Sequence, residues 1–173
     1  MKIFILAAAI TGLAAAPARA EYGLAAGGVG FSGFGAFGYY QPEGSGWRFG
    51  AEYGTAGGVS RDKAGRELSR DEEAMRGFFV QRQFTPGGEG RWYAAAALLR
   101  WTRREKAAAG DSAAGSDLSP YFGLGWLRRF GGRWFADLGV LAAPWARLDI
   151  PTSAGPGRSR GAADLHAALG LRF

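Results

Sequence analysis

The sequence has no cysteine and only one histidine among its 173 residues. Without cysteine the chain has no disulfide framework and no thiol chemistry, and this absence is compatible with an oxidising periplasm. One histidine and scattered carboxylates leave too few ligands for a zinc site. We therefore expect no bound metal and no other cofactor.

The sequence also has no long apolar run after residue 20 and little excess charge. No segment there reaches the roughly 18 apolar residues that a membrane helix needs. The net charge is +6, and it falls to +4 without the first twenty residues, which carry Lys2 and Arg19 but no acid. So small an excess gives no reason to expect nucleic acid as a partner.

The first twenty residues have the order of a secretory leader. Lys2 precedes an apolar stretch over residues 3–16, and Ala18-Arg19-Ala20 forms a small-residue cleavage motif. A membrane anchor is the alternative, but the stretch is short and ends in small residues. We expect residues 1–20 to be a cleaved signal peptide and residues 21–173 to form one domain.

The last segment of the chain alternates two kinds of side chain. One parity is apolar and the other is polar or small: Ala163, Leu165, Ala167, Leu169, Leu171 and Phe173 against Asp164, His166, Ala168, Gly170 and Arg172. Successive side chains of a strand point to opposite faces. Apolar residues outside and polar residues inside are typical of a transmembrane β-barrel strand.

Turn signals and charged stretches divide the rest of the chain. Counting back from Phe173 predicts strands at about 22–28, 31–41, 47–57, 74–84, 91–103, 118–130, 133–149 and 162–173. The first hairpin has an alternative, one bent strand over 22–41, but seven strands cannot close an all-antiparallel barrel. We expect the charged stretches at 60–73, 102–117 and 151–160 to be long extracellular loops. The sequence thus predicts an all-β fold, an eight-stranded antiparallel transmembrane β-barrel.

The strand at 91–103 provides a test of length. Tyr93, Leu99 and Trp101 share one parity with two alanines, and we interpret this face as the outward one. The eight residue steps from Tyr93 to Trp101 span roughly 26 Å, or about 20 Å along the barrel axis at a tilt of about 40°. That length fits an apolar band with an aromatic residue at each edge.

Two strands interrupt this simple alternation. Pro144 predicts either a β-bulge in the next-to-last strand or the point where this strand leaves the ladder. A bulge would turn Trp145 outward. The sequence does not decide which residues of the strand at 74–84 face the lumen, because Arg76 and Arg82 share a parity with Phe78.

Charged side chains collect on the predicted inner face. This set is Arg48, Glu52, Arg100, Arg129, Asp137, Arg147, Asp164, His166 and Arg172. The lumen of an eight-stranded barrel is only wide enough for side chains to fill it, and buried charges are costly unless they are paired. We therefore expect salt bridges that close the lumen. A narrow pore or a proton-linked gate is the alternative, built on Glu52, Arg100, Asp137 and Arg147.

Catalysis would depend on His166. A serine–histidine–aspartate site needs a serine within reach of the imidazole, and the same-face position next to His166 is Ala168. The His-x-Ser pair of some outer-membrane lipid A deacylases therefore lacks its nucleophile here. Ser119, on another strand, is the remaining candidate. We expect no catalytic site.

Two segments resemble the second and third strands of OmpA-type barrel domains. Residues 33–42 (GFGAFGYYQP) form a glycine-rich strand that ends in Tyr-Gln before a turn, and residues 47–54 (WRFGAEYG) begin with an aromatic residue. The order Glu52-Tyr53-Gly54 departs from the Glu-x-Gly-Tyr-like pattern of that family. A terminal aromatic such as Phe173 resembles the assembly signal of bacterial outer-membrane barrels.

The resemblance implies a small OmpA/OmpX-like barrel without a peptidoglycan-binding domain. We then expect a monomer in the outer membrane of a Gram-negative bacterium, in contact with outer-membrane lipid and lipopolysaccharide. Periplasmic chaperones and the barrel-assembly machinery would be partners during biogenesis. The expected role is non-enzymatic, either structural or in surface interaction. A soluble periplasmic barrel that binds a small apolar ligand remains a further alternative.

Overall fold

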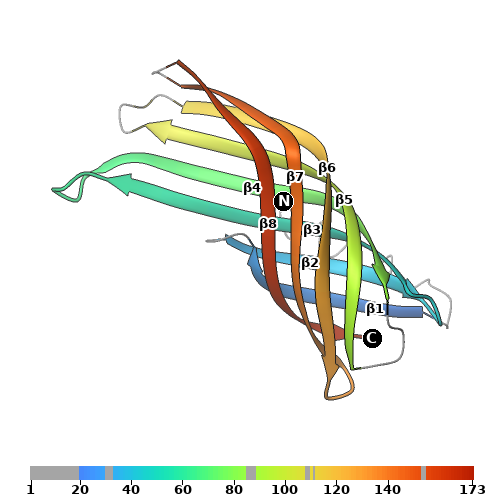
Figure 1. Cartoon of the computed structure of the whole chain (residues 1–173). Helices are drawn as coiled ribbons and strands as arrows, with labels where there is room; N and C mark the ends of the chain where they lie inside the picture. The colour runs from blue at the N-terminus through green and yellow to red at the C-terminus, as the bar shows by residue number, and fades with distance from the viewer. Residues whose placement is uncertain (1–19, 30–32, 85–88, 108–109, 111, 153–154) are drawn as a thin grey trace.

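The structure is a computed structural model that describes residues 20–29, 33–84, 89–107, 110, 112–152 and 155–173. It is a closed barrel of antiparallel strands in which β8 completes the ring by pairing with β1 (Figure 1). The strands are β1 (Ala20–Val29), β2 (Gly33–Pro42), β3 (Trp47–Arg61), β4 (Glu67–Gln83), β5 (Gly90–Ala107), β6 (Ser112–Phe130), β7 (Trp134–Thr152) and β8 (Gly155–Arg172). The predicted fold class is confirmed.

The N-terminal part of the prediction is tested only from residue 20 onward. The first hairpin is two strands, paired from Ala20↔Pro42 to Val29↔Gly33, so the alternative of one bent strand is wrong. Residues 1–19 lie outside the described residues, and the signal peptide stays a prediction. Across the ranges that the structure describes, no helix is both long and apolar enough to cross a membrane.

Tight turns mark one end of the barrel, here called the short-turn end. Gly131 and Gly132 join β6 to β7 with φ of 55° and 71°, a backbone conformation that glycine adopts without strain and that suits a tight hairpin. The end of the chain lies here too, because the Phe173 amide donates to the Tyr22 carbonyl at 2.8 Å.

The opposite end is here called the long-hairpin end. Its strands continue into segments that the sequence predicts to be loops. β3 and β4 pair up to Arg61↔Glu67, and β5 and β6 pair up to Lys106↔Ser112. Figure 1 shows the β3–β4 hairpin projecting from the barrel. β7 and β8 likewise pair up to Thr152↔Gly155. The prediction of long loops at 60–73, 102–117 and 151–160 is therefore wrong, because backbone pairing needs no apolar face. In these segments both faces are polar, so the alternation that signals a strand is missing.

Asp62 shapes the turn of the β3–β4 hairpin. Its Oδ1 accepts the backbone amides of Ala64 and Arg66 at 2.8 and 2.9 Å, and its Oδ2 accepts the Arg66 Nε–H at 2.8 Å. The hydrogen bonds from Arg66 hold the pKa of Asp62 below its ordinary value. The turn is therefore held by an ionised carboxylate at neutral pH.

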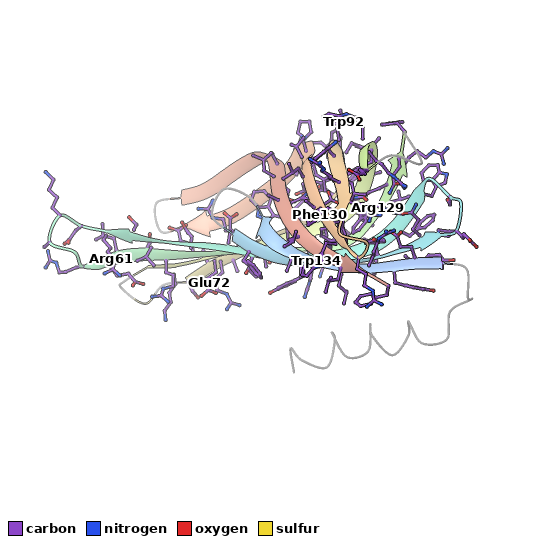
Figure 2. All side chains as sticks on the ribbon, turned by 90° about the horizontal axis from the view of Figure 1, so that it is seen from below. Arg61, Glu72, Trp92, Arg129, Phe130 and Trp134 are labelled. Carbon is purple, nitrogen blue, oxygen red and sulfur yellow. The ribbon has the colours of Figure 1, made fainter. Side chains whose placement is uncertain are left out.

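The outward face carries apolar and aromatic side chains. Near the short-turn end these are Trp47, Phe84, Trp92, Phe130, Trp134 and Phe173. Farther along the strands follow Phe78, Leu98, Phe122, Leu124, Leu138 and Leu165. Figure 2 shows Trp92, Phe130 and Trp134 on the barrel, whereas Arg61 and Glu72 lie on the projecting hairpin. An aromatic edge beside an apolar band is typical of a transmembrane barrel surface.

The phase of β5 is opposite to the prediction. Tyr93 and Leu99 are 1% and 0% exposed inside the barrel, whereas Trp92 and Leu98 are 62% and 49% exposed outside it. The prediction that Arg100 lines the lumen is therefore wrong, because it lies on the outer face two residues beyond Leu98. Both faces of β5 are rich in alanine and leucine, so hydrophobicity alone could not assign them.

The open phase of β4 is settled by two inner residues. Phe79 and Gln81 are buried in the lumen. Arg76 and Arg82 consequently face outward, together with Phe78.

The bulge predicted at Pro144 is present in β7. The register with β8 shifts between Ala143 and Arg147. Trp145 faces outward as predicted, with its ring 5.8 Å from that of Phe122. The same shift places Arg147 on the exposed outer face. The prediction that Arg147 lines the lumen is therefore wrong, since a bulge reverses the parity of every residue beyond it.

Side chains from all around the barrel fill its interior. The buried apolar residues include Ala25, Tyr39, Phe79, Tyr93, Leu99, Tyr121, Leu127, Phe135 and Leu141. A Cβ added at Gly125 or Gly139 would collide with the ring or hydroxyl of Tyr93. Glycine at these two positions therefore gives the Tyr93 ring its space in the lumen.

Candidate functional site

Two groups of inward-facing polar residues contain most of the residues predicted from the sequence. The central cluster consists of Arg48, Glu52, Tyr93, Asp137, Asp164 and His166, and the mouth cluster consists of Glu21, Tyr39, Arg129 and Arg172, near the short-turn end. Seven of the nine residues predicted to line the lumen therefore face it. The two exceptions are Arg100 and Arg147, for the reasons given above.

Asp137 is the hub of the central cluster. Its Oδ1 accepts the Tyr93 hydroxyl at 2.6 Å and lies 3.2 Å from His166 Nε2. Its Oδ2 lies 3.4 Å from Arg48 Nη1. These contacts join β3, β5, β7 and β8 across the lumen. Because Asp137 and Arg48 are both 0% exposed, each needs the other to offset the cost of burying its charge.

The Arg48 guanidinium also lies against aromatic rings. Its Cζ is 3.6 Å from the centroid of the Tyr39 ring and 5.3 Å from that of Phe135, within the range of cation–π attraction. Among the described residues, its Nε and Nη2 have no hydrogen-bond partner. The ring contacts and Asp137 therefore carry much of the stabilisation of this buried cation.

His166, Asp164 and Glu52 border a small cavity on the long-hairpin side of Asp137. The cavity measures about 20 Å³, which fits one water molecule. His166 Nδ1 lies 4.0 Å from Asp164 Oδ2 and is buried without a hydrogen-bond partner.

Neither a nucleophile nor a metal set accompanies His166. Ser119, the remaining candidate nucleophile, donates its hydroxyl to Asp117 at 2.5 Å. Within the described ranges, no serine hydroxyl is bonded to His166 and no group of three or more possible metal ligands occurs. The hydrogen bonds of His166 to Tyr93 and Asp137, at 3.1 and 3.2 Å, are those of a packed interior residue.

Glu21 ties four strands together at the mouth. Its carboxylate accepts from Arg129 Nη2 at 2.8 and 2.7 Å and from Arg172 Nη1 at 3.1 Å. It also accepts the Tyr39 hydroxyl at 2.8 Å. Arg129 and Arg172 were predicted from the sequence, but Glu21 was not. The one sequence signal for an inward Glu21 is that it shares a parity with Gly23 and the small residues beyond it in the short, glycine-rich β1.

Similarity to known proteins exists at the level of structure. No protein-family model matches the sequence, and neither does any curated protein. The N-terminal β-barrel domain of Pseudomonas aeruginosa OprF matches with a TM-score of 0.59 and 15% identity, over 90% of this chain and 97% of that chain. Ail, the attachment invasion locus protein of Yersinia pestis, was solved in complex with the heparin analogue sucrose octasulfate. It matches with a TM-score of 0.56 and 13% identity, over the same two shares. Neisserial surface protein A matches with a TM-score of 0.54 and 12% identity, over 90% and 95%.

The chain has the fold of the small eight-stranded outer-membrane β-barrels. In such a barrel the interior is filled by side chains rather than open. The central cluster fits this fold because its hydrogen bonds and ion pairs connect strands on opposite sides of the lumen. The contacts of the mouth cluster hold β1 and β8, the strands that close the ring, to β2 and β6.

The short-turn end of this outer-membrane-type barrel opens into a wider cavity. It measures about 910 Å³ and is bordered by Arg91, Arg133 and the arginines of the mouth cluster. Arg91 Nη1 donates to Gln83 Oε1 at 2.7 Å. Its lining residues all belong to the short-turn end, so the cavity is a vestibule at one end of the barrel.

Replacing Glu21 by glutamine tests the role of the mouth cluster. We expect the free energy of unfolding to fall by about 1–3 kcal/mol, because two arginines lose their charged hydrogen-bond acceptor. Urea titration of the refolded protein in detergent micelles, followed by tryptophan fluorescence, measures this change. Glu43→Gln is the matched control, since Glu43 is exposed at the same mouth. Equal stability of the two variants would contradict the role given to Glu21.

Proposed function

We propose that this chain is an integral, monomeric, non-enzymatic protein of a bacterial outer membrane, with a closed lumen and surface hairpins that contact partners. The observation that carries the proposal is the packing of the lumen. The side chains of Arg48, Tyr93, Leu99, Tyr121, Leu127, Phe135 and Asp137 are each at most 1% exposed. A lumen filled in this way supports a structural or surface role over transport.

The outer surface supports the membrane location. On β5 the apolar outward residues run from Trp92 to Leu98, and Arg100 is the first charged outward residue after them. The eight residue steps from Trp92 to Arg100 span roughly 26 Å, or about 20 Å along the axis of a barrel with strands tilted by about 40°. This height approaches the ~25 Å apolar band of outer-membrane barrels. A soluble barrel would not need an aromatic edge beneath such a band.

The proposed partners follow from this location. The outward apolar band contacts membrane lipid and, on the outer side, lipopolysaccharide. Phe173 is exposed at the short-turn end, where the barrel-assembly machinery would bind it as an assembly signal and periplasmic chaperones would precede that step. The Ail complex with a sulfated sugar supports the further proposal that polyanionic sugars are among the surface partners.

Two measurements on the mature protein test this function. We expect it to need detergent for extraction and to migrate faster on gels when unheated, because a closed barrel resists unfolding by dodecyl sulfate. We also expect planar bilayers containing the protein to show no discrete conductance steps.

For each alternative function, one result would contradict our proposal and favour that alternative. Extraction without detergent would indicate the soluble ligand-binding barrel. Reproducible conductance would indicate the narrow pore. A change in envelope lipids that is lost in His166→Ala would indicate a lipid-modifying enzyme.

A further inference from the structure

Two arginines lie directly opposite each other on the outer face of the barrel. Arg76 of β4 and Arg100 of β5 are register partners and both are exposed. In the part of the chain that the structure describes, neither takes part in an ion pair or a side-chain hydrogen bond. Like charges directly opposite on one face of a sheet are destabilising. The pair is therefore a cationic site without an anion from the protein.

The position of the pair corresponds to one edge of the apolar band. Arg76 lies eight residues from Phe84, and Arg100 lies eight residues from Trp92, both of which are aromatic residues at the opposite edge. The distance is about 20 Å along the barrel axis. A charge at the midplane of the band would be costly, whereas one at its edge costs little. The pair therefore lies where lipid headgroups begin.

The outward neighbours of the pair are aromatic and aliphatic side chains. Tyr53 of β3 flanks Arg76, and Leu118 of β6 flanks Arg100. The next outward residues toward the middle of the band are Phe78 and Leu98, which are 73% and 49% exposed. Acyl chains fit against this side of the pair.

On the side of the pair away from the membrane, the first outward row has small side chains and the next rows have charged ones. Ala74 and Thr102 form the next outward row. Beyond them Glu72 lies opposite Arg104, and Arg70 lies opposite Lys106. The outer face of this hairpin pair thus keeps a positive excess even though Glu72 offsets one cation. No acid lies in the rows next to Arg76 and Arg100.

We propose that Arg76 and Arg100 bind a phosphate group of a phosphorylated glycolipid in the outer leaflet. Opposed residues on a sheet have Cβ atoms about 5 Å apart, so both guanidinium groups reach one phosphate. Guanidinium groups bind phosphate oxygens through paired hydrogen bonds. The acyl chains of the same lipid lie along Phe78 and Leu98. The site rests on the proposed membrane location, and it assigns two residues and a phosphate group to the proposed contact with lipopolysaccharide.

The test compares lipids and variants in mixed detergent micelles. Lipid A is added to the refolded protein, and the thermal unfolding midpoint and the binding curve are recorded. We expect lipid A to raise the midpoint, whereas dephosphorylated lipid A and inorganic phosphate do not. In the double variant Arg76→Gln/Arg100→Gln, lipid A binding should weaken about tenfold or more, as expected for lost charged hydrogen bonds.

The matched control is Arg82→Gln/Arg128→Gln, which removes two exposed outward arginines near the opposite edge of the band. It should bind lipid A as the wild type does. Equal weakening in both double variants, or equal binding of phosphorylated and dephosphorylated lipid, would overturn the site. The gel shift of each variant verifies folding. If the wild type needs no detergent, the membrane proposal itself fails, and that result is separate from a missing lipid preference.

Discussion

Replacing Asp137 by alanine is expected to lower the free energy of unfolding by about 3–5 kcal/mol, because it leaves Arg48 buried without its counter-charge. Asp137 Oδ2 lies 3.4 Å from Arg48 Nη1, and both side chains are 0% exposed. The Tyr93 hydroxyl loses its 2.6 Å acceptor at the same time. Urea titration in detergent micelles measures the change.

Two further variants distinguish a lost ion pair from a general loss of packing. Glu72→Ala removes an exposed outer carboxylate of β4, and its effect should stay within about 0.5 kcal/mol. Arg48→Met in the Asp137→Ala background should recover stability, because it removes the unpaired cation and leaves an apolar chain against Tyr39 and Phe135. If Asp137→Ala were no less stable than Glu72→Ala, Asp137 would not be the hub of the interior.

Replacing Gly125 by alanine is expected to lower the free energy of unfolding by about 1–3 kcal/mol through overpacking. The added Cβ would meet the Tyr93 ring and would lie 2.7 Å from the Leu138 carbonyl oxygen. Neither can move easily, because Tyr93 is held by Asp137 and the carbonyl belongs to the neighbouring strand. The same titration measures the loss.

Gly58→Ala is the matched control for this substitution. Gly58 also lies in a strand, but a Cβ there meets no atom within 4 Å. Its replacement should leave stability unchanged or raise it slightly, since alanine restricts the unfolded chain. If the two substitutions had the same effect, the space at Gly125 would not be what places Tyr93 in the lumen.

The faces of a strand are easiest to predict where one face alone carries charge. In β8, Asp164, His166 and Arg172 alternate with leucines and alanines, and the structure keeps that division. In β5 both faces are apolar, because a narrow barrel fills its interior with residues such as Tyr93 and Leu99. Hydrophobicity could not tell a lipid-facing leucine from a core leucine there.

The errors at the site have local causes. Pro144 correctly predicted the bulge, but the reversal of parity beyond it removes Arg147 from the lumen. Glu21 escaped prediction because β1 is short, rich in glycine and adjacent to the predicted leader. The pairing of Tyr93 with Asp137 depends on Gly125 of β6 and Gly139 of β7, and such a tertiary contact leaves no periodic signal in the sequence.

The β3–β4 hairpin affects the entropy of any binding event at its tip. From Tyr53, in the row of Arg76, to Arg61 the ladder continues for eight residues, roughly 26 Å along the strand. Ordering the backbone costs about 1–2 kcal/mol of conformational entropy per residue at 25 °C. In this hairpin the backbone is already ordered before a partner binds. A partner that contacts Arg61 or Arg66 therefore meets a preorganised surface, and little of its binding free energy is lost to ordering the chain.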